Sequence, residues 1–206
     1  EDICQALAIH PAKKYQNDGG PGAREIVSLL RETVTADLQP VLNQVGFNVA
    51  STIYRGADDD IQLFLDALIF NWLIAGTDAH AKNYSVLIGG RGLVRLAQLC
   101  DIASILPFDD IDPRKAKLAM KVGDEYRLHH IGLPEWRKLA IAVKTDPDAM
   151  IARVRDMARR LPDLAADEAR PCPRSGAGLD SHQPALGRGC MRDRTQHGVE
   201  IGPHRL

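Results

Sequence analysis

The sequence has no excess of charge of either sign. Its 206 residues include 26 Lys and Arg and 27 Asp and Glu, for a formal net charge of -1. A protein that binds nucleic acid or an anionic membrane through its general surface carries a surplus of basic residues. The charge balance therefore gives no support to DNA binding as the main function, although it leaves room for a local basic patch.

Long uninterrupted apolar runs are also absent. The most apolar stretch, IQLFLDALIFNWLIAG, is interrupted by Asp66 and Asn71, and the first ten residues, EDICQALAIH, lack a basic segment followed by a long apolar core. A membrane-spanning helix needs about 20 predominantly apolar residues, and a secretory leader needs both of those missing parts. We expect neither export nor membrane insertion. Because 45% of the residues are hydrophobic and 26% charged, we expect a globular protein rather than a disordered one.

Cysteine is scarce and its spacing is uninformative. The sequence has four, and none belongs to a C-x-x-C pair; they are Cys4, Cys100, Cys172 and Cys190. Paired spacings of that kind are typical of zinc modules and redox centres, and dense cysteines of secreted disulfide scaffolds. The usage fits a reduced, cytoplasmic protein.

Helical periodicity is present along most of the chain. A short helix is expected at about 2–8 and a longer one over REIVSLLRETV. Three acids, Asp58 to Asp60, lie where a helix N-terminus favours negative charge, and Gly76 closes the element. The helix between them carries apolar residues at 3.6-residue spacing: Ile61, Phe64, Leu65, Leu68, Ile69 and Trp72. The pattern predicts a long, mostly buried helix.

Later segments predict one hairpin and two further helices. YSVLI, GGRG and LVRLA are typical of two short strands joined by a turn, over about 84–97. LPEWRKLAIAV and DPDAMIARVRDMARRL are helical in pattern, the second with Asp146 as N-cap and Pro147 at its first position. The fold class expected is mainly α (α+β), with a small β-hairpin in the middle.

The last part of the chain differs in composition. From residue 171 onward there are six glycines, four prolines and five arginines without any periodicity. Such a segment cannot bury enough apolar surface to fold by itself. We expect one folded lobe over 1–165 and an irregular tail, disordered or aberrant, over 166–206.

A polar cluster follows the long buried helix, in the stretch GTDAHAKNYS. Asp78 and Asn83 are five residues apart, the expected hairpin comes next, and Asp101 follows the hairpin. Protein kinases space their catalytic Asp, their metal-binding Asn and a second metal-binding Asp in this way. The spacing predicts that Asp78 is the general base, that Asn83 and Asp101 bind Mg²⁺, and that ATP is the phosphate donor. Taken singly, each of the three is also typical of a turn or cap residue.

Two further residues of the loop are candidates for contacts with the nucleotide phosphates. His80 lies two residues after Asp78, where it either supports the loop or contacts a phosphate, and Lys82 can reach a phosphate unless it is merely a solvated loop lysine. A metal-dependent hydrolase is an alternative, with Asp78, His80 and Asp101 as ligands together with one histidine of YRLHHI. That alternative leaves the asparagine at the kinase spacing unexplained.

Several blocks together resemble one family. FNWLIAGTDAHAKNYSVLI and LAQLCDIAS, with EDICQALAI, KYQNDGGPG and KLAMKVG in the same order, closely resemble the C-terminal lobe of the HipA family of bacterial toxin kinases. The resemblance implies an ATP-dependent serine/threonine protein kinase, the toxin of a type II toxin–antitoxin system that promotes persistence. It also implies aminoacyl-tRNA synthetases as substrates, an antitoxin as partner, and DNA only indirectly through that antitoxin. Asp78, Asn83 and Asp101 match the family's catalytic and metal-binding residues, and His80 and Lys82 match residues near the phosphates.

The sequence also departs from that family. The family's N-terminal lobe, with its glycine-rich phosphate loop and nucleotide-binding lysine, has no counterpart here. NDGGPGAR is rich in glycine, but no strand precedes it, so we do not interpret it as a phosphate loop. We expect a C-lobe fragment, the later part of a longer protein, that is inactive alone. The alternative is a catalytically silent kinase-like module that binds an antitoxin or another partner.

Overall fold

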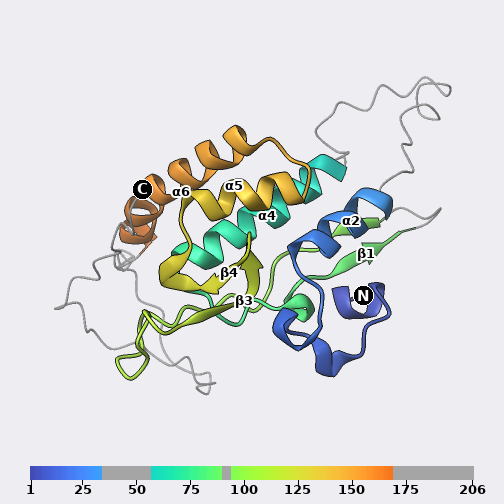
Figure 1. The fold of residues 1–206 in the computed structure, drawn as a ribbon, viewed down its shortest axis with the longest axis horizontal. Coiled ribbons are helices and arrows are strands. Elements are labelled where there is room, and N and C mark those ends of the chain that lie inside the picture. Colours follow the sequence, from blue (N-terminus) through green and yellow to red (C-terminus); the bar gives the residue numbers. More distant parts are fainter. Residues whose placement is uncertain (34–56, 90–93, 169–206) are drawn as a thin grey trace, which may run out of the picture.

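The computed structural model describes residues 1–33, 57–89 and 94–168 and shows a mainly helical body with two small hairpins (Figure 1). The helices in these ranges are α1 (Ile3–Ala6), α2 (Ala23–Thr33), α4 (Ala57–Leu73), α5 (Leu133–Ala142) and α6 (Pro147–Glu168). The strands are β1 (Val86–Ile88), β2 (Val94–Leu96), β3 (Lys117–Val122) and β4 (Glu125–Arg127). This confirms the predicted mixture of many helices and little strand. No helix in the described ranges is long and apolar enough to cross a membrane.

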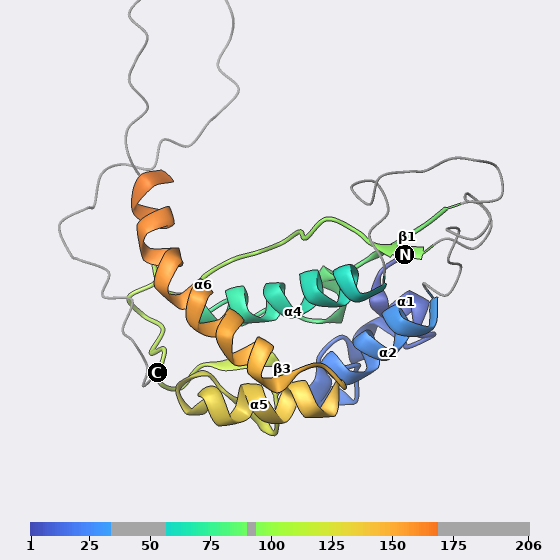
Figure 2. The ribbon, with the colours of Figure 1, turned by 90° about the horizontal axis from the view of Figure 1, so that it is seen from above.

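Helix α4 forms the centre of the body, in contact with α2, α6 and β2 (Figure 2). All six apolar residues that the sequence placed on this helix are buried. They share the core with α5, since Trp72 and Trp136 pack edge to face with ring centroids 5.6 Å apart. The predicted long, buried helix is confirmed, and its C-terminal end delivers the polar loop that follows it.

The N-terminal segment lies beside the first hairpin. Strands β1 and β2 pair antiparallel with Val86 opposite Leu96, which confirms the predicted hairpin; its turn, 90–93, lies outside the described residues. The backbone N–H of Ile3 donates to the Tyr84 carbonyl at 3.0 Å, and that of Val86 donates to the Glu1 carbonyl at 2.7 Å. These bonds hold the first residues of the chain against the segment that leaves the polar loop.

A second hairpin, β3–β4, was not predicted. Its turn is formed by Gly123 and Asp124, and Gly123 has a positive φ of 59° that favours glycine. A Cβ at this position would also lie 2.8 Å from the Glu135 carbonyl oxygen. A Gly-Asp pair between two residues of β character was the available signal. The hairpin adds a second short sheet to the single one expected.

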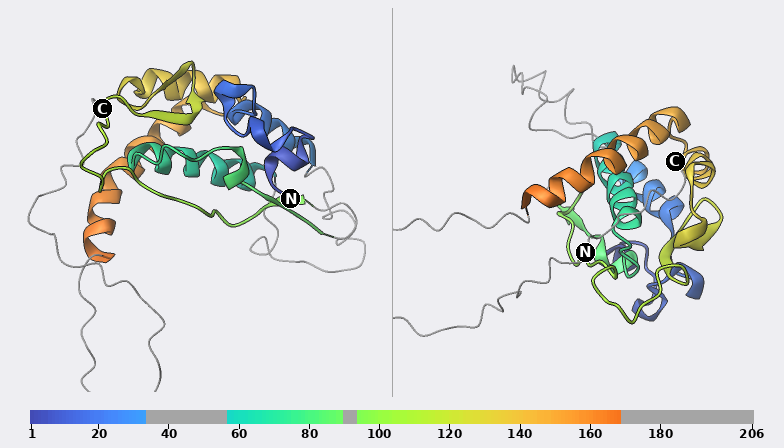
Figure 3. Two further views of the ribbon diagram at one scale, coloured as in Figure 1. Left: turned by 90° about the horizontal axis from the view of Figure 1, so that it is seen from below. Right: turned by 90° about the vertical axis from the view of Figure 1, so that its left-hand side faces the viewer.

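The C-terminal helices follow their predicted start signals. The Asp146 side chain accepts hydrogen bonds from the backbone N–H groups of Asp148 (2.8 Å) and Ala149 (3.3 Å), so the predicted N-cap is confirmed. Helix α6 packs on α5 and then projects beyond the body (Figure 3). It continues to Glu168, past the expected lobe boundary at 165. The rest of the expected tail, 169–206, lies outside the described residues.

Two ion pairs on α4 predict very different stability losses. Asp60, only 1% exposed, accepts hydrogen bonds from the Arg95 guanidinium at 2.8 and 3.2 Å and from the Leu96 N–H at 3.0 Å. Asp60→Ala leaves these donors without an acceptor and should lower the free energy of unfolding by about 3–5 kcal/mol. Asp66 pairs with the more exposed Arg153, so the matched Asp66→Ala should cost about 0–1 kcal/mol. Urea unfolding measures both, and equal losses would contradict this assignment.

Candidate functional site

The polar loop begins with a sharp change of direction after α4. Ala75 has a positive φ of 53°, and the Gly76 N–H donates to the Asn71 carbonyl at 2.6 Å. A Cβ on Gly76 would lie 2.5 Å from the Asn71 side-chain oxygen, so a larger residue would have to displace the buried Asn71 side chain. The Ile105 N–H donates to the Ala75 carbonyl at 3.2 Å. This bond holds the segment after Asp101 against the start of the loop.

Asn83 and Asp101 are in direct contact. The Asn83 Nδ2 donates to Asp101 Oδ2 at 2.7 Å, across the β1–β2 hairpin that separates them in sequence. The His80 backbone N–H donates to Asn83 Oδ1 at 3.0 Å, which fixes which way the amide points. Asp101 itself has a positive φ of 55°. A non-glycine residue in this region costs about 1–3 kcal/mol and is frequent at functional sites.

Asp78 lies on the exposed side of the same loop. Its Oδ1 accepts a hydrogen bond from the Tyr15 hydroxyl at 2.5 Å. This hydrogen bond, together with burial and the negative charge, raises the pKa of Tyr15 to about 12. The phenol therefore stays protonated, and remains a donor, across the whole physiological pH range.

His80 is buried between these groups. Its ring packs edge to face against Tyr15 with centroids 5.1 Å apart, and its Nδ1 has no hydrogen-bond partner among the described residues. Burial lowers the pKa of His80, as does the nearby Lys14 ammonium, while the Asp78 and Asp101 carboxylates act in the opposite direction. Both carboxylates therefore lie close enough to His80 to influence it.

Lys82 points away from the cluster. Its ammonium donates to Asp2 Oδ2 at 2.6 Å, and this hydrogen bond raises the pKa of Lys82. Asp2 also caps α1, since its Oδ1 accepts from the Gln5 N–H at 2.9 Å. The lysine that acts on His80 is Lys14 instead. The expected role of Lys82 near a phosphate stays a prediction, and in this structure the side chain ties the loop to the N-terminal helix.

Sequence reasoning missed Tyr15 and Lys14 as members of the site. Both belong to the KYQNDGGPG block, which the sequence analysis used only as a mark of family resemblance. The Lys14 carbonyl accepts a hydrogen bond from the Ala81 N–H at 3.2 Å, so backbone and side-chain contacts both join this block to the loop. An aromatic hydroxyl next to a basic residue in a matched block was the only available signal.

The side chains present fit a magnesium site. Asp101 offers a carboxylate, and Asn83 offers an amide whose oxygen accepts from the His80 N–H and keeps one lone pair, while its nitrogen faces Asp101. The amide must turn for its oxygen to share an ion with Asp101. Mg²⁺ is bound by such hard oxygen donors, commonly with one or two protein ligands beside phosphate and water oxygens. The hydrolase alternative needed three or more His and Asp ligands together. Within the described ranges no group of three His, Cys, Asp or Glu side chains is placed to hold a metal.

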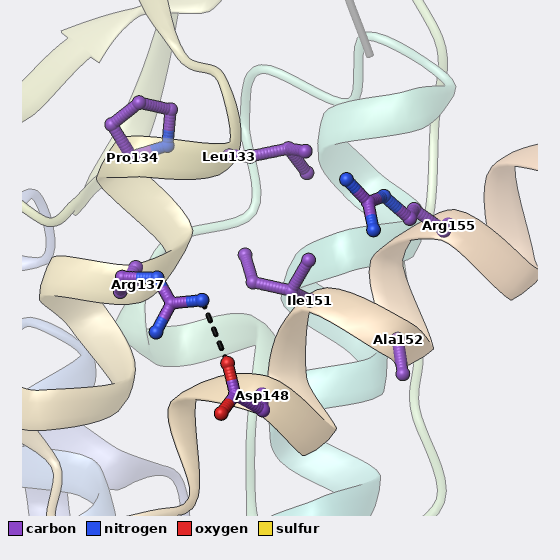
Figure 4. Close-up of a pocket in the computed structure, with 7 residues that line it drawn as sticks. All are labelled: Leu133, Pro134, Arg137, Asp148, Ile151, Ala152 and Arg155. Carbon is purple, nitrogen blue, oxygen red and sulfur yellow. Dashed lines mark hydrogen bonds and ion pairs between the residues drawn. The ribbon is translucent and has the colours of Figure 1, made fainter.

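The other hollows of the surface do not belong to this cluster. A groove of about 460 Å³ between α5 and α6 is lined by Leu133, Pro134, Arg137, Asp148, Ile151, Ala152 and Arg155 (Figure 4). None of these residues comes from the loop or from the hairpin. In the part of the chain that the structure describes, a cavity of about 10 Å³ lies next to Asn83 and Asp101. It is too small for a nucleotide.

Comparison with known proteins identifies the family. The profile of the HipA-like C-terminal domain matches residues 1–165. The chain belongs to this family. The predicted resemblance to HipA proteins is thereby confirmed.

Individual relatives agree with that assignment. The chain is 34% identical over 140 residues, 68% of its length, to the protein named "Putative kinase Y4mE" of Sinorhizobium fredii, covering 28% of that protein. It is 25% identical over 169 residues, 81% of its length, to the serine/threonine-protein kinase toxin HipA of Shewanella oneidensis, covering 35% of it.

A solved structure shows the same fold. A chain of the Shewanella oneidensis HipA, HipB and operator DNA complex superposes with a TM-score of 0.63 at 22% identity, over 84% of the present chain and 38% of the solved one. The HipA-like chain described here thus spans between 28% and 38% of the length of these proteins.

Proposed function

We propose that the chain is the C-terminal lobe of a HipA-like serine/threonine protein kinase toxin, which transfers the γ-phosphoryl group of ATP to a protein hydroxyl. The observation that carries this proposal is the 2.7 Å contact between Asn83 and Asp101, which lies beside the loop that carries Asp78. A local turn or cap explains each residue singly, but not the contact of two kinase-spaced residues, Asn83 and Asp101, across a hairpin.

Each residue has a role that its position supports. Asn83 and Asp101 would hold Mg²⁺, which when bound neutralises charge on the phosphates. Asp78 lies on the exposed side and accepts the proton of the substrate serine or threonine hydroxyl. At the same time, the hydroxyl oxygen forms a bond to the γ-phosphorus of ATP. The bond from that phosphorus to the bridging oxygen breaks, and ADP leaves. Lys14 contributes positive charge beside the loop.

The partners follow from the relatives. A HipA relative is named as a kinase toxin, and the solved neighbour is a complex of HipA, HipB and operator DNA. We therefore propose that an antitoxin binds this protein and that DNA is contacted only through it. From the family resemblance we also propose an aminoacyl-tRNA synthetase as substrate. Such a substrate would place the reaction in the cytoplasm.

The test is a phosphotransfer assay on the chain joined to the N-terminal lobe of the Shewanella oneidensis relative. With labelled ATP and a candidate synthetase, Asp78→Asn should lower kcat by about 10²- to 10⁴-fold, because it removes the base, and change the KM for ATP little. Asp110→Asn, an exposed acid outside the cluster, is the matched control and should leave both constants unchanged.

The same assay separates the enzyme from a silent interaction module. A module predicts that the joined protein binds nucleotide or antitoxin without transferring label to any protein. Equal rates for Asp78→Asn and its control would remove Asp78 from the mechanism even if label were transferred.

A further inference from the structure

We propose that Tyr15 is a positioning residue for Asp78, acting through the hydrogen bond that joins them; this rests on the kinase function proposed above. The two residues are 63 positions apart, and the Tyr15 hydroxyl donates to Asp78 Oδ1 at 2.5 Å. Asp78 is exposed, and among the described residues the Tyr15 hydroxyl is the side chain seen to bond its carboxylate. Figure 1 shows the N-terminal segment, in blue, beside the green chain that leaves the loop.

Tyr15 is itself held against the loop from two sides. Its ring lies edge-on to the buried His80 ring, at an interplanar angle of 79°. One residue earlier, the Lys14 carbonyl accepts from the Ala81 N–H. Both contacts are made with loop residues shortly after Asp78, so the Tyr15 hydroxyl belongs to a side chain that is already packed against the loop.

The glycine-rich stretch after Tyr15 fixes the conformation of the backbone around Tyr15. The Gly20 N–H donates to the Tyr15 carbonyl at 2.9 Å, and a Cβ on Gly20 would lie 2.1 Å from the Lys13 carbonyl oxygen. The Gln16 side chain accepts from the Lys121 N–H of β3 at 2.7 Å. The segment is therefore closed on itself and fastened to the second hairpin, which gives these glycines a structural reason unrelated to phosphate binding.

The hydrogen bond from Tyr15 orients the Asp78 carboxylate and still leaves one of its oxygens available to the substrate. A carboxylate has two oxygens, and Tyr15 engages only Oδ1, so Oδ2 is left for the substrate hydroxyl. The raised pKa of Tyr15, about 12, means that the donor is present at every pH at which a protein kinase works. A base held in one orientation avoids the loss of rate that follows from a misplaced reacting group.

The first experiment tests the contact in the chain of 206 residues and does not require phosphotransfer activity. 3-Fluorotyrosine is placed at position 15 and its phenol is titrated by ¹⁹F NMR. In Asp78→Asn the midpoint should fall by at least about one pH unit, because the charged acceptor is gone. Asp18→Asn, which removes another nearby carboxylate, should move it less. Equal midpoints in the parent and Asp78→Asn would overturn the proposal.

The second experiment tests positioning in the joined protein. Tyr15→Phe keeps the ring and its packing on His80 but removes the hydroxyl, and should lower kcat by about 10- to 100-fold with the KM for ATP within about twofold. Tyr126→Phe, on β4, is the matched control and should change neither constant. In the Asp78→Asn background Tyr15→Phe should cost less than about a further twofold, since it acts through the missing carboxylate.

The outcomes separate this inference from the function on which it rests. Phosphotransfer by the parent that Tyr15→Phe leaves unchanged overturns positioning alone. A faster Tyr15→Phe also overturns it, because the phenol would then be masking the base. A parent that transfers no label overturns the proposed function, and the catalytic part of this proposal with it.

Discussion

Asp101→Ala should weaken Mg²⁺-dependent nucleotide binding by at least about 100-fold when the N-terminal lobe is supplied, because a carboxylate ligand is worth several kcal/mol at a divalent ion. Asn83→Ala should act in the same direction, since it removes the amide oxygen and leaves the Asp101 carboxylate without its 2.7 Å partner. Isothermal titration with a nonhydrolysable ATP analogue, with and without Mg²⁺, measures both effects.

Folding must be separated from ligand loss in this experiment. Asp109→Ala removes an exposed acid from the same segment and should bind as the parent does. Circular dichroism should show a cooperative transition for Asp101→Ala at a somewhat lower melting temperature than for the parent, because alanine adopts the positive φ of this position less readily than aspartate and the contact with Asn83 is lost. Nucleotide affinity within about twofold of the parent would show that Asp101 is not a ligand, since a lost ligand costs far more.

The fold was predictable where the signal was local. Helix α4 follows from apolar spacing over several turns, and α6 begins at the Asp146 cap and Pro147, so both rest on neighbouring residues alone. The β3–β4 hairpin was missed although Gly123 marks its turn, because KLAMKV lacks an alternation of apolar and polar residues and contains several helix-favouring residues, and β3 also depends on contact with α5. Local patterns thus identify elements whose residues favour them and miss strands whose residues do not.

The site was predictable in part for the same reason. The five-residue spacing of Asp78 and Asn83 and the hairpin before Asp101 are visible in sequence order, and the contact between Asn83 and Asp101 agrees with them. The Tyr15 hydrogen bond spans 63 residues, and Lys82 turns to Asp2, 80 residues away. Which distant partner a side chain contacts depends on how the backbone packs, so residue spacing in the sequence could not predict these two contacts.

The N-terminal segment shows why a composition rule alone would mislead. NDGGPGAR has the glycines of a phosphate loop, but Gly20 and Gly22 lie against atoms of this chain, whereas Gly19 is open. A Cβ on Gly20 would meet the Lys13 carbonyl, and one on Gly22 would lie 2.2 Å from the Gln16 amide nitrogen. A phosphate loop requires backbone N–H groups that face an open cradle. These glycines instead permit close packing beneath Tyr15.

The chain of 206 residues is expected to transfer phosphate at least about 10³-fold more slowly than the same chain joined to a complete N-terminal lobe. Positioning provides most of phosphoryl-transfer catalysis, and it requires contacts on both sides of the nucleotide. Asp78, Asn83 and Asp101 would supply the metal and hydroxyl side, whereas Gly20 and Gly22 of the glycine-rich segment lie against atoms of this chain. The γ-phosphate would stay mobile and hydrated.

The measurement compares label transfer from ATP to a candidate synthetase by the chain, by the joined protein and by the joined protein with Asp78→Asn. Mixing the chain with a separate N-terminal lobe is the matched control, because it supplies the same groups without the covalent link and should restore part of the rate. Comparable transfer by the chain alone and by the joined protein would mean that residues 1–206 hold the phosphates by themselves. Transfer only by the joined and mixed proteins, lost with Asp78→Asn, is the expected result, since both halves of the site are then needed and Asp78 is its base.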